Sequence, residues 1–488
     1  MKPVWLGEWL SGQITREQPT SLQRQLYDAL RSGIAERKLA PGVRLPSTRT
    51  LAQELGLSRN TLLVVFEQLQ AQGYLESRRG SGCFVARVLP SSVIGKTSAT
   101  ANLGATDAAL SQRCQEWLQT TTFAPTRNAG AFAPAIADLR AFPFEQWWRL
   151  VHKHQRNLPW QRLEYGSNGG SPALKLALTN YLSVTRNVHC EPEQIIITSS
   201  AQSALDLCCR VLADNGDGFA LEEPGYIGAR AAAIAAGLSI FPIAVDEQGI
   251  QIEPLNRIKP KLIYTTPSHQ FPNCGVMRLP RRRALLQYAA QRGSYIIEDD
   301  YDAEIRFESK PLPSLQGQDS HGRVLYLGTF SKILYPALRL AYLVVPPGLV
   351  DAFVRSQNRL QRAADLTYQA ALAEFIDSGK FARHIQKMRV IYGERNRYLQ
   401  QLLTPHLKPH WTLLGGDAGL HFVLQSKQRI DDVALAKAAF AKELTVWPLS
   451  PFYHGDKRQY GLIMGYAAAD KRELKRGYAE LKRMLNWT

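Results

Sequence analysis

The amino-acid sequence predicts a multidomain chain, in which a small N-terminal domain of short helices and a hairpin precedes a large α/β domain with a mostly parallel central sheet. Apolar residues recur at helical spacing within residues 1–88. From about residue 126, short uninterrupted apolar runs alternate with helical stretches instead. The length of 488 residues agrees with this division, because a single hydrophobic core does not grow that large.

Composition is that of an ordinary soluble globular protein, with 45% hydrophobic and 21% charged residues. No apolar run reaches the roughly 18 residues that a membrane span needs, and Met1–Leu10 does not resemble a signal peptide. Six cysteines without Cys-x-x-Cys spacing indicate reduced thiols and a cytoplasmic protein. The net charge of +17 favours a polyanionic partner, although residues 1–88, with 12 basic and 7 acidic side chains, carry only part of it.

Three helices and a short hairpin are predicted for residues 1–88. The first helix spans about 20–36 and is capped by Thr20 or Ser21. The second opens at Pro46-Ser47 and ends at Gly56, and the third runs from a cap at Ser58 to about Gly73. The hairpin over 74–86 has a basic, Gly-rich tip. This order is typical of a winged helix-turn-helix, whose third helix enters the major groove of DNA; a small helical interaction module is the alternative.

Three segments, 44–49, 55–61 and 80–85, closely resemble the DNA-binding domain of the GntR family. The resemblance implies that hydroxyls and helix N-termini bind phosphates and that Arg49 and Arg59 reach base edges. The residues expected to face DNA are Arg44, Ser47, Thr48, Arg49, Ser58, Arg59, Asn60, Thr61, Arg78 and Arg79.

Residues 89–125 are predicted to be a flexible linker. They begin with Pro90-Ser91-Ser92 and are rich in Ser, Thr, Ala and Gly. A short helix over 110–118 is the one regular element expected there.

The large domain, 126–488, contains apolar runs that predict buried strands of a mostly parallel sheet. Residues able to carry chemistry directly follow these runs, so they are expected to gather along one edge of the sheet. The runs are 194–198, 219–222, 262–265, 295–298 and 324–327. Residues 380–488 are expected to form a smaller C-terminal subdomain.

Lys332 follows the last of these runs. Thr329 and Ser331 precede it closely, and Arg339 follows seven residues later. A lone lysine is most often a solvated surface charge. At the end of a buried strand, however, a lysine can form an imine with an aldehyde cofactor. The neighbouring hydroxyls and the arginine are suited to hold a phosphate.

The other runs are followed by candidate residues of the same site. A helix begins at Ser200, Ala201 and Gln202, and its free N–H groups suit a phosphate. An ordinary capped helix would have the same local sequence pattern. The acidic cluster at 298–302 could bind a hard cation, although the end of a strand lacks the loop spacing of such sites. From the sequence alone, Tyr226 is as readily a buried core residue as a site residue. His269 is likewise as readily structural as functional.

Residues 326–342, 266–272 and the acidic cluster resemble the corresponding segments of MocR-type transcription regulators, which join a GntR-like domain to a fold-type I aminotransferase-like domain. The resemblance covers nearly the whole chain and implies pyridoxal 5'-phosphate as cofactor and a homodimer. It implies that Tyr226 stacks on the pyridine ring, Asp299 faces its nitrogen, and Tyr301 and His269 lie near its phenolic oxygen. Asp299 precedes Lys332 by 33 residues, the spacing of MocR-type members. Two departures are Ser200, where aminotransferases have glycine, and Asn273-Cys274-Gly275, which moves a glycine of the pattern by one place.

A third departure concerns activity. Aminotransferases of this fold hold the substrate carboxylate with an arginine near the C-terminus, and Ile463 takes its place here; Arg458 is nearby but at the wrong spacing. The leading hypothesis is therefore a transcription regulator that senses pyridoxal phosphate or an amine and turns over little or no substrate. The alternatives are an active aminotransferase with an attached DNA-binding domain, and a DNA-binding protein whose large domain only dimerises. No metal is expected.

Overall fold

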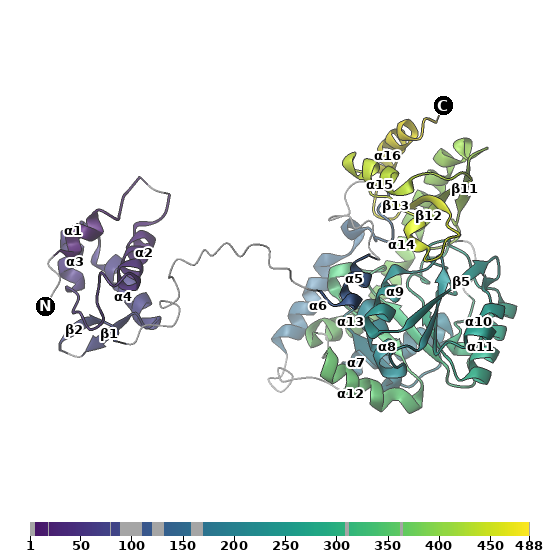
Figure 1. Cartoon of the computed structure of the whole chain (residues 1–488), viewed down its shortest axis with the longest axis horizontal. Coiled ribbons are helices and arrows are strands. Elements are labelled where there is room, and N and C mark those ends of the chain that lie inside the picture. Colours follow the sequence, from purple (N-terminus) through teal and green to yellow (C-terminus); the bar gives the residue numbers. More distant parts are fainter. Residues whose placement is uncertain are drawn as a thin grey trace. The chain divides into compact units, whose positions relative to one another are not determined.

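The computed structural model describes residues 5–17, 19–78, 80–87, 110–119, 131–157, 169–307, 312–361 and 365–487. Contacts within the chain divide it into two units, unit 1 (Met1–Ala109) and unit 2 (Leu110–Thr488), both drawn in Figure 1. None of the helices in the described ranges is long and apolar enough to cross a membrane.

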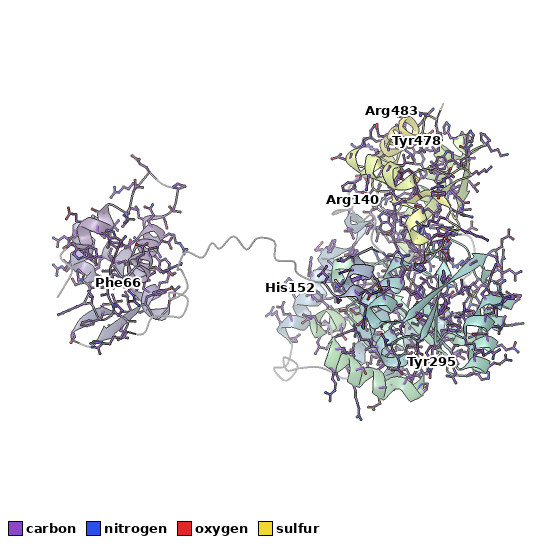
Figure 2. All side chains as sticks on the ribbon, viewed as in Figure 1. Phe66, Arg140, His152, Tyr295, Tyr478 and Arg483 are labelled. Carbon is purple, nitrogen blue, oxygen red and sulfur yellow. The ribbon has the colours of Figure 1, made fainter. Side chains whose placement is uncertain are left out.

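Unit 1 is a winged helix-turn-helix, as the sequence predicts. The predicted caps are in place, because Ser21, Ser47 and Ser58 each accept a hydrogen bond from a backbone N–H of the helix that follows. Gly56 ends the second predicted helix at a φ of 62°, the left-handed conformation that glycine favours. Phe66, labelled in Figure 2, lies in the apolar core. The elements are α1 (Leu6–Ser11), α2 (Leu22–Ala35), α3 (Thr48–Leu55), α4 (Arg59–Ala71), β1 (Leu75–Arg78) and β2 (Gly82–Val85), and the two strands pair antiparallel.

The helix α1 is a feature that sequence reasoning missed. It has only six residues and no side-chain cap, so its local pattern is too short to predict a helix. It is stabilised by packing, because Leu6 and Leu10 are fully buried in the core of unit 1. A Cβ added to Gly7 would lie 2.2 Å from a carboxylate oxygen of Glu54, so α1 approaches α3 closely at this glycine.

Unit 2 is built on an eight-stranded sheet in the order β3-β10-β9-β8-β7-β4-β5-β6. The pairs β9-β8, β8-β7, β7-β4 and β4-β5 are parallel, which confirms the predicted mostly parallel sheet. All five predicted runs are strands. The bounds are β3 (Ile195–Thr198), β4 (Gly218–Glu223), β5 (Ser239–Asp246), β6 (Gly249–Ile250), β7 (Leu262–Thr265), β8 (Tyr295–Asp299), β9 (Val324–Thr329) and β10 (Ala341–Val344).

Strand β10 was not among the predicted runs. It follows the lysine segment and lies between β3 and β9, antiparallel to both. Two strands that are each antiparallel to the same neighbour are parallel to one another. The carboxyl ends of β3, β9, β8, β7 and β4 therefore meet at one edge of the sheet, as the sequence analysis expects of the residues that follow them.

Helices cover this sheet, and a second sheet forms the C-terminal part of unit 2 (Figure 1). The second sheet is antiparallel, in the order β11-β12-β14-β13. Its strands are β11 (Trp411–Leu414), β12 (His421–Ser426), β13 (Trp447–Pro448) and β14 (Tyr460–Gly465). The α-helices of unit 2 are α5 (Gln112–Gln119), α6 (Phe144–Arg156), α7 (Pro172–Arg186), α8 (Ala201–Leu212), α9 (Ile227–Ala236), α10 (Glu253–Ile258), α11 (Leu279–Arg292), α12 (Val350–Leu360), α13 (Leu366–Asp377), α14 (Lys380–Leu403), α15 (Asp432–Ala441) and α16 (Lys471–Met484).

Helix α5 lies within the stretch 89–125, belongs to unit 2 and packs on α9. The Arg113 guanidinium donates a hydrogen bond of 3.5 Å to the carbonyl oxygen of Ala235 near the end of α9. Apart from residues 110–119, the predicted linker lies outside the described residues.

Candidate functional site

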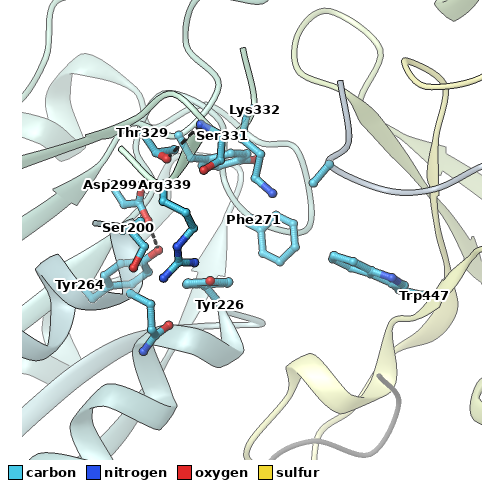
Figure 3. A pocket seen from close by; sticks show the side chains of 14 residues that line it. Ser200, Tyr226, Tyr264, Phe271, Asp299, Thr329, Ser331, Lys332, Arg339 and Trp447 are labelled. Carbon is cyan, nitrogen blue, oxygen red and sulfur yellow. Dashed lines mark hydrogen bonds between the residues drawn. The ribbon is translucent and has the colours of Figure 1, made fainter. Parts of the chain in front are cut away.

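A cavity of about 270 Å³ lies at the carboxyl edge of the central sheet (Figure 3). Residues that follow β3, β4, β8 and β9 meet there, as expected from the direction of these strands. Ten of the eleven residues predicted to bind a cofactor line the cavity, and His269 does not. The lining residues are Ala135, Ser200, Ala201, Gln202, Tyr226, Tyr264, Phe271, Asp299, Tyr301, Thr329, Ser331, Lys332, Arg339 and Trp447.

Lys332 projects its amine into this cavity from the turn after β9 (Figure 3). Burial lowers the pKa of Lys332, and the carboxylates of Asp302 and Asp299 oppose that shift only in part. A lysine with a lowered pKa holds more of its amine in the neutral form near pH 7. Since the neutral amine is the nucleophile, Lys332 is suited to attack a carbonyl group.

Asp299, at the end of β8, has one oxygen engaged and one free. The Tyr264 hydroxyl donates a hydrogen bond of 2.7 Å to Oδ2. The other oxygen, Oδ1, is buried and has no hydrogen-bond partner in the described part of the chain. Burial raises the pKa of Asp299 to about 7, against the Tyr264 hydrogen bond and the charge of Lys332, which lower it. A buried carboxylate oxygen without a partner requires a hydrogen-bond donor, and a protonated ring nitrogen of a ligand would supply one.

The neighbouring Asp300 is engaged elsewhere. Its Oδ2 accepts hydrogen bonds from Nε of Arg186 at 2.7 Å and from the Tyr326 hydroxyl at 2.6 Å, and all three side chains are buried. Arg186 also donates to the Ser268 hydroxyl. Burial acts to raise the pKa of Asp300, but the charge of Arg186 and the hydrogen bonds that Asp300 accepts together outweigh burial and lower the pKa. Asp300 is thus half of a buried ion pair that joins β8 to the end of α7 and does not line the cavity.

One end of the cavity is suited to an anion. Ser200 caps α8 by accepting a hydrogen bond of 3.0 Å from the backbone N–H of Ser203, and Ala201 and Gln202 form the first turn. The hydroxyl residues Thr329 and Ser331 and the guanidinium of Arg339 line the same cavity. A helix N-terminus, hydroxyl groups and an arginine are the donors that proteins combine around a phosphate.

Aromatic rings form much of the rest of the wall. Tyr226 and Phe271 lie edge to face, with 6.0 Å between ring centroids, and Trp447 completes this side (Figure 3). His269 lies behind Tyr301. Its Nδ1 is 2.9 Å from the Tyr301 hydroxyl and 2.9 Å from a carboxylate oxygen of Asp302. His269 thus contacts the cavity through Tyr301.

Four lining residues were missed from the sequence: Ala135, Tyr264, Phe271 and Trp447. Tyr264 lies inside the run 262–265, and a phenol hydroxyl in a fully buried strand was a usable signal. Phe271 lies within the segment 266–272, which was chosen for His269. Ala135 and Trp447 come from segments more than 300 residues apart, and nothing in their local sequence indicates a shared site.

Ile463 lies in β14 and is fully buried. It belongs to an apolar cluster with Phe271 and Tyr301, which also line the cavity, and it faces Trp447 across the β13-β14 pair. Arg458 does not line the cavity, and its Nε donates to the carbonyl oxygen of Gly455 at 3.1 Å. Among the described residues, the cationic side chains in the cavity wall are Lys332 and Arg339.

The predicted DNA-facing residues of unit 1 gather on three elements. Ser47 with Thr48 and Arg49 begins α3, and Ser58 with Arg59, Asn60 and Thr61 begins α4; both arginines are exposed. Arg44 pairs with the hairpin through an isolated bridge to Phe84. The Arg78 guanidinium lies 4.6 Å from the Phe84 ring centroid and 3.6 Å from a carboxylate oxygen of Glu76. Arg79 lies outside the described residues.

Comparisons with known families match both units. Residues 138–477 match the family described as aminotransferase class I and II, and residues 22–85 match the bacterial regulatory proteins of the gntR family. The chain is 39% identical to the probable rhizopine catabolism regulatory protein MocR of Rhizobium meliloti, over 96% of this chain and 94% of that one. It is 29% identical to the pyridoxine biosynthesis transcriptional regulator PdxR of Corynebacterium glutamicum, over 95% of this chain and 96% of that one.

Among solved structures, the α-aminoadipate aminotransferase LysN of Thermus thermophilus, complexed with N-(5'-phosphopyridoxyl)-L-leucine, is similar to this chain. The TM-score is 0.68 at 26% identity, and the match covers 77% of this chain and 94% of that one.

Proposed function

The chain belongs to the MocR-type transcription regulators, and we propose that unit 2 binds a small-molecule effector at the cavity and thereby changes the affinity of unit 1 for a double-stranded DNA operator. As a member of this family it is a pyridoxal-phosphate-dependent, DNA-binding regulator. The observation that carries the proposal is the meeting of Lys332, Asp299 and Arg339 in one cavity, in a chain that also has a gntR-family domain.

The residues of the cavity fit pyridoxal 5'-phosphate. When bound, this group supplies an aldehyde for amines to attack and an electron-withdrawing ring. We propose that Lys332 holds the aldehyde covalently, that Asp299 Oδ1 accepts from the ring nitrogen, and that Tyr226 packs against the ring. Tyr301, oriented by His269, would contact the phenolic oxygen. The phosphate would lie at the anion-suited end, against Ser200, Ala201, Gln202, Thr329, Ser331 and Arg339.

The effector is proposed to be pyridoxal phosphate itself or an amine that reacts with it. The pyridoxine biosynthesis regulator among the relatives supports the first choice by its name alone. We further propose a homodimer, because two winged domains would read a two-part operator, and action in the cytoplasm, where a bacterial operator lies.

Replacing Asp299 with asparagine should weaken cofactor binding at least about tenfold, or 1.4 kcal/mol. Asparagine keeps an acceptor for the Tyr264 hydroxyl but removes the charge that pairs with the ring nitrogen. Titrating the purified apoprotein with pyridoxal phosphate and following its absorbance gives the dissociation constant.

Asp300→Asn is the matched control for this measurement. It removes the partner of the buried Arg186 guanidinium, so it should destabilise unit 2 by about 3 kcal/mol or more. In thermal denaturation it should lower the midpoint more than Asp299→Asn does. The assignment of Asp299 is wrong if Asp299→Asn binds the cofactor as tightly as the wild type.

Replacing Arg49 or Arg59 with alanine should each weaken operator binding by about 1–3 kcal/mol, or roughly 5- to 150-fold, if these arginines read bases. Both are exposed at the starts of α3 and α4, where a helix-turn-helix contacts DNA. The measurement is a binding isotherm with a DNA fragment selected for binding to the wild-type protein, at fixed salt, since phosphate contacts make affinity depend on salt.

Arg24→Ala is the control variant. Arg24 is also exposed but forms an ion pair with Asp28 along α2, outside the predicted interface. It should change operator affinity little, and none of the three variants should change the cofactor spectrum. Equal operator affinity of the wild type and both test variants would remove Arg49 and Arg59 from the interface.

A further inference from the structure

The cavity is apolar on the side that lies away from its anion-suited end. In Figure 3, Ser200 and Asp299 lie on one side of the Lys332 amine and Trp447 lies on the other. The indole of Trp447 extends from β13 toward Phe271, with its ring nitrogen at the far end. We call Phe271 and Trp447 the aromatic wall.

The aromatic wall is held in place by residues that do not line the cavity. Phe452 stacks on Trp447 with 6.4 Å between ring centroids and lies edge to face against Phe271 at 5.4 Å. Trp447 also lies opposite the buried Ile463 in the β13-β14 pair. Aromatic pairs prefer defined geometries, so these contacts give the wall its shape before a ligand binds. Preformed apolar surface beside a few polar groups is typical of a ligand pocket.

The cavity leaves no charged side chain for a second ionic group of a ligand. Three charged residues line it in the described part of the chain: Asp299, Lys332 and Arg339. The proposed function assigns them to the ring nitrogen, the aldehyde and the phosphate of the cofactor. An ionic group that leaves water without finding a partner of opposite charge is strongly disfavoured.

Trp447 keeps part of its surface uncovered. Its side chain is partly exposed although Phe452 stacks on it, whereas Phe271 is 6% exposed. A hydrocarbon group that covers this surface leaves water as well, and both losses of apolar surface favour binding. The aromatic wall therefore favours an apolar group over a charged one.

We propose that the effector is a monoamine with an apolar body beyond its nitrogen, and that Trp447 and Phe271 determine this specificity. The proposal rests on the proposed function, because the amine nitrogen must meet the cofactor held at Lys332. The body of the amine then lies against the aromatic wall. Diamines and amino acids with a distal carboxylate would bring a second charge to a surface that offers it no partner.

The first test measures binding to the full-length wild-type protein freed of cofactor. The probes are stable conjugates, made by reducing pyridoxal phosphate onto methylamine, propylamine or pentylamine, and their dissociation constants are measured by calorimetry. From the methylamine to the pentylamine conjugate the dissociation constant should fall at least about tenfold, because burying one methylene contributes about fourfold. The methylamine conjugate reports the cofactor site without the apolar body.

The outcomes separate this proposal from the one on which it rests. If no conjugate binds, the proposed function fails and this inference fails with it. If all conjugates bind with equal affinity, the aromatic wall only covers the cofactor ring, and this inference alone is overturned.

A second pair of conjugates tests charge at constant length. Pentylamine ends in a methyl group where 1,4-diaminobutane ends in an ammonium group. The diaminobutane conjugate should bind at least about tenfold more weakly, because its ammonium group finds no carboxylate at the aromatic wall. Equal or tighter binding of the diaminobutane conjugate would overturn the proposal.

Variants of Trp447 test the specificity determinant. Trp447→Ala should weaken binding of the pentylamine conjugate at least about tenfold and that of the methylamine conjugate less than about threefold, with Trp447→Phe between Trp447→Ala and the wild type. Trp148→Ala is the control, because Trp148 is exposed on α6 and does not line the cavity. Equal weakening of both conjugates by Trp447→Ala would show a merely structural role. The wild-type series tests the proposal even if Trp447→Ala does not fold.

The last measurement concerns regulation. With the cofactor-bound protein and a DNA fragment selected for binding to it, free pentylamine should shift DNA affinity at a concentration at least about tenfold lower than 1,4-diaminobutane does. The opposite order, or equal potency of the two amines, would overturn the proposal.

Discussion

Lys332→Ala protein should retain no covalently trapped cofactor after treatment with borohydride. Lys332 carries the amine that points into the cavity, and burial lowers its pKa, which raises the fraction of the amine in the neutral, nucleophilic form. Alanine has no amine, and Arg339, the other cation of the wall, cannot lose its proton to act in its place. Trapped cofactor should fall at least about 100-fold, a loss of function expected when a covalent nucleophile is deleted.

Lys175 supplies a matched control. It is a second buried lysine whose pKa is lowered chiefly by burial, but it lies in α7 and does not line the cavity. Lys175→Arg should trap as much cofactor as the wild type, which would show that a lowered pKa alone does not create the site. Mass spectrometry of the reduced protein locates the modified residue. Equal labelling of the wild type and Lys332→Ala would disprove the role of Lys332.

The residues that converge on the cavity were predictable where they follow a strand. Ser200, Tyr226, Asp299 and Lys332 each come just after a continuous apolar run, and parallel strands bring such positions to one edge. The order of the strands was not needed for this inference. The antiparallel β10, which the sequence did not predict, therefore leaves this inference unchanged.

What the sequence did not predict depends on long-range packing. Trp447 and Ala135 reach the cavity from segments whose local patterns carry no chemistry. Helix α1 forms because Leu6 and Leu10 are buried by the rest of unit 1, and not because of its own propensity. His269 was predicted at the cavity from its position after β7, but its ring lies behind Tyr301, a distinction that only side-chain geometry supplies.

Unit 2 should convert common α-amino acids slowly, at rates at least about 100-fold below the roughly 10 per second of typical enzymes. Transamination needs the substrate carboxylate held so that the bond to be broken stands across the ring plane, and misplacement by about 1 Å costs on the order of 10²-fold in rate. In the wall of the cavity the described cations are Lys332 and Arg339. The first is assigned to the aldehyde and the second to the phosphate, so neither is left for a carboxylate.

The measurement is single-turnover absorbance spectroscopy of the cofactor-bound protein. Each α-amino acid is paired with the amine that lacks its carboxylate, for example phenylalanine with phenethylamine. If the cavity offers the carboxylate no cation, the two members of a pair should bind with similar affinity, within about threefold. An arginine at the position of Ile463 would favour the amino acid over the amine much more strongly, because its bidentate contact with the carboxylate adds both charge and orientation.

A regulator needs no turnover, only a ligand that binds one of its conformations more tightly than the other. Moving an equilibrium from 1:99 to 99:1 takes about 5.5 kcal/mol of differential binding, and a smaller shift takes less. A charge-assisted contact at Asp299 and the phosphate contacts at α8 and Arg339 are of the kind that supplies such energies. Rapid conversion of the cofactor to pyridoxamine phosphate by any common amino acid, at about 1 per second or faster, would contradict this account and identify unit 2 as an active aminotransferase.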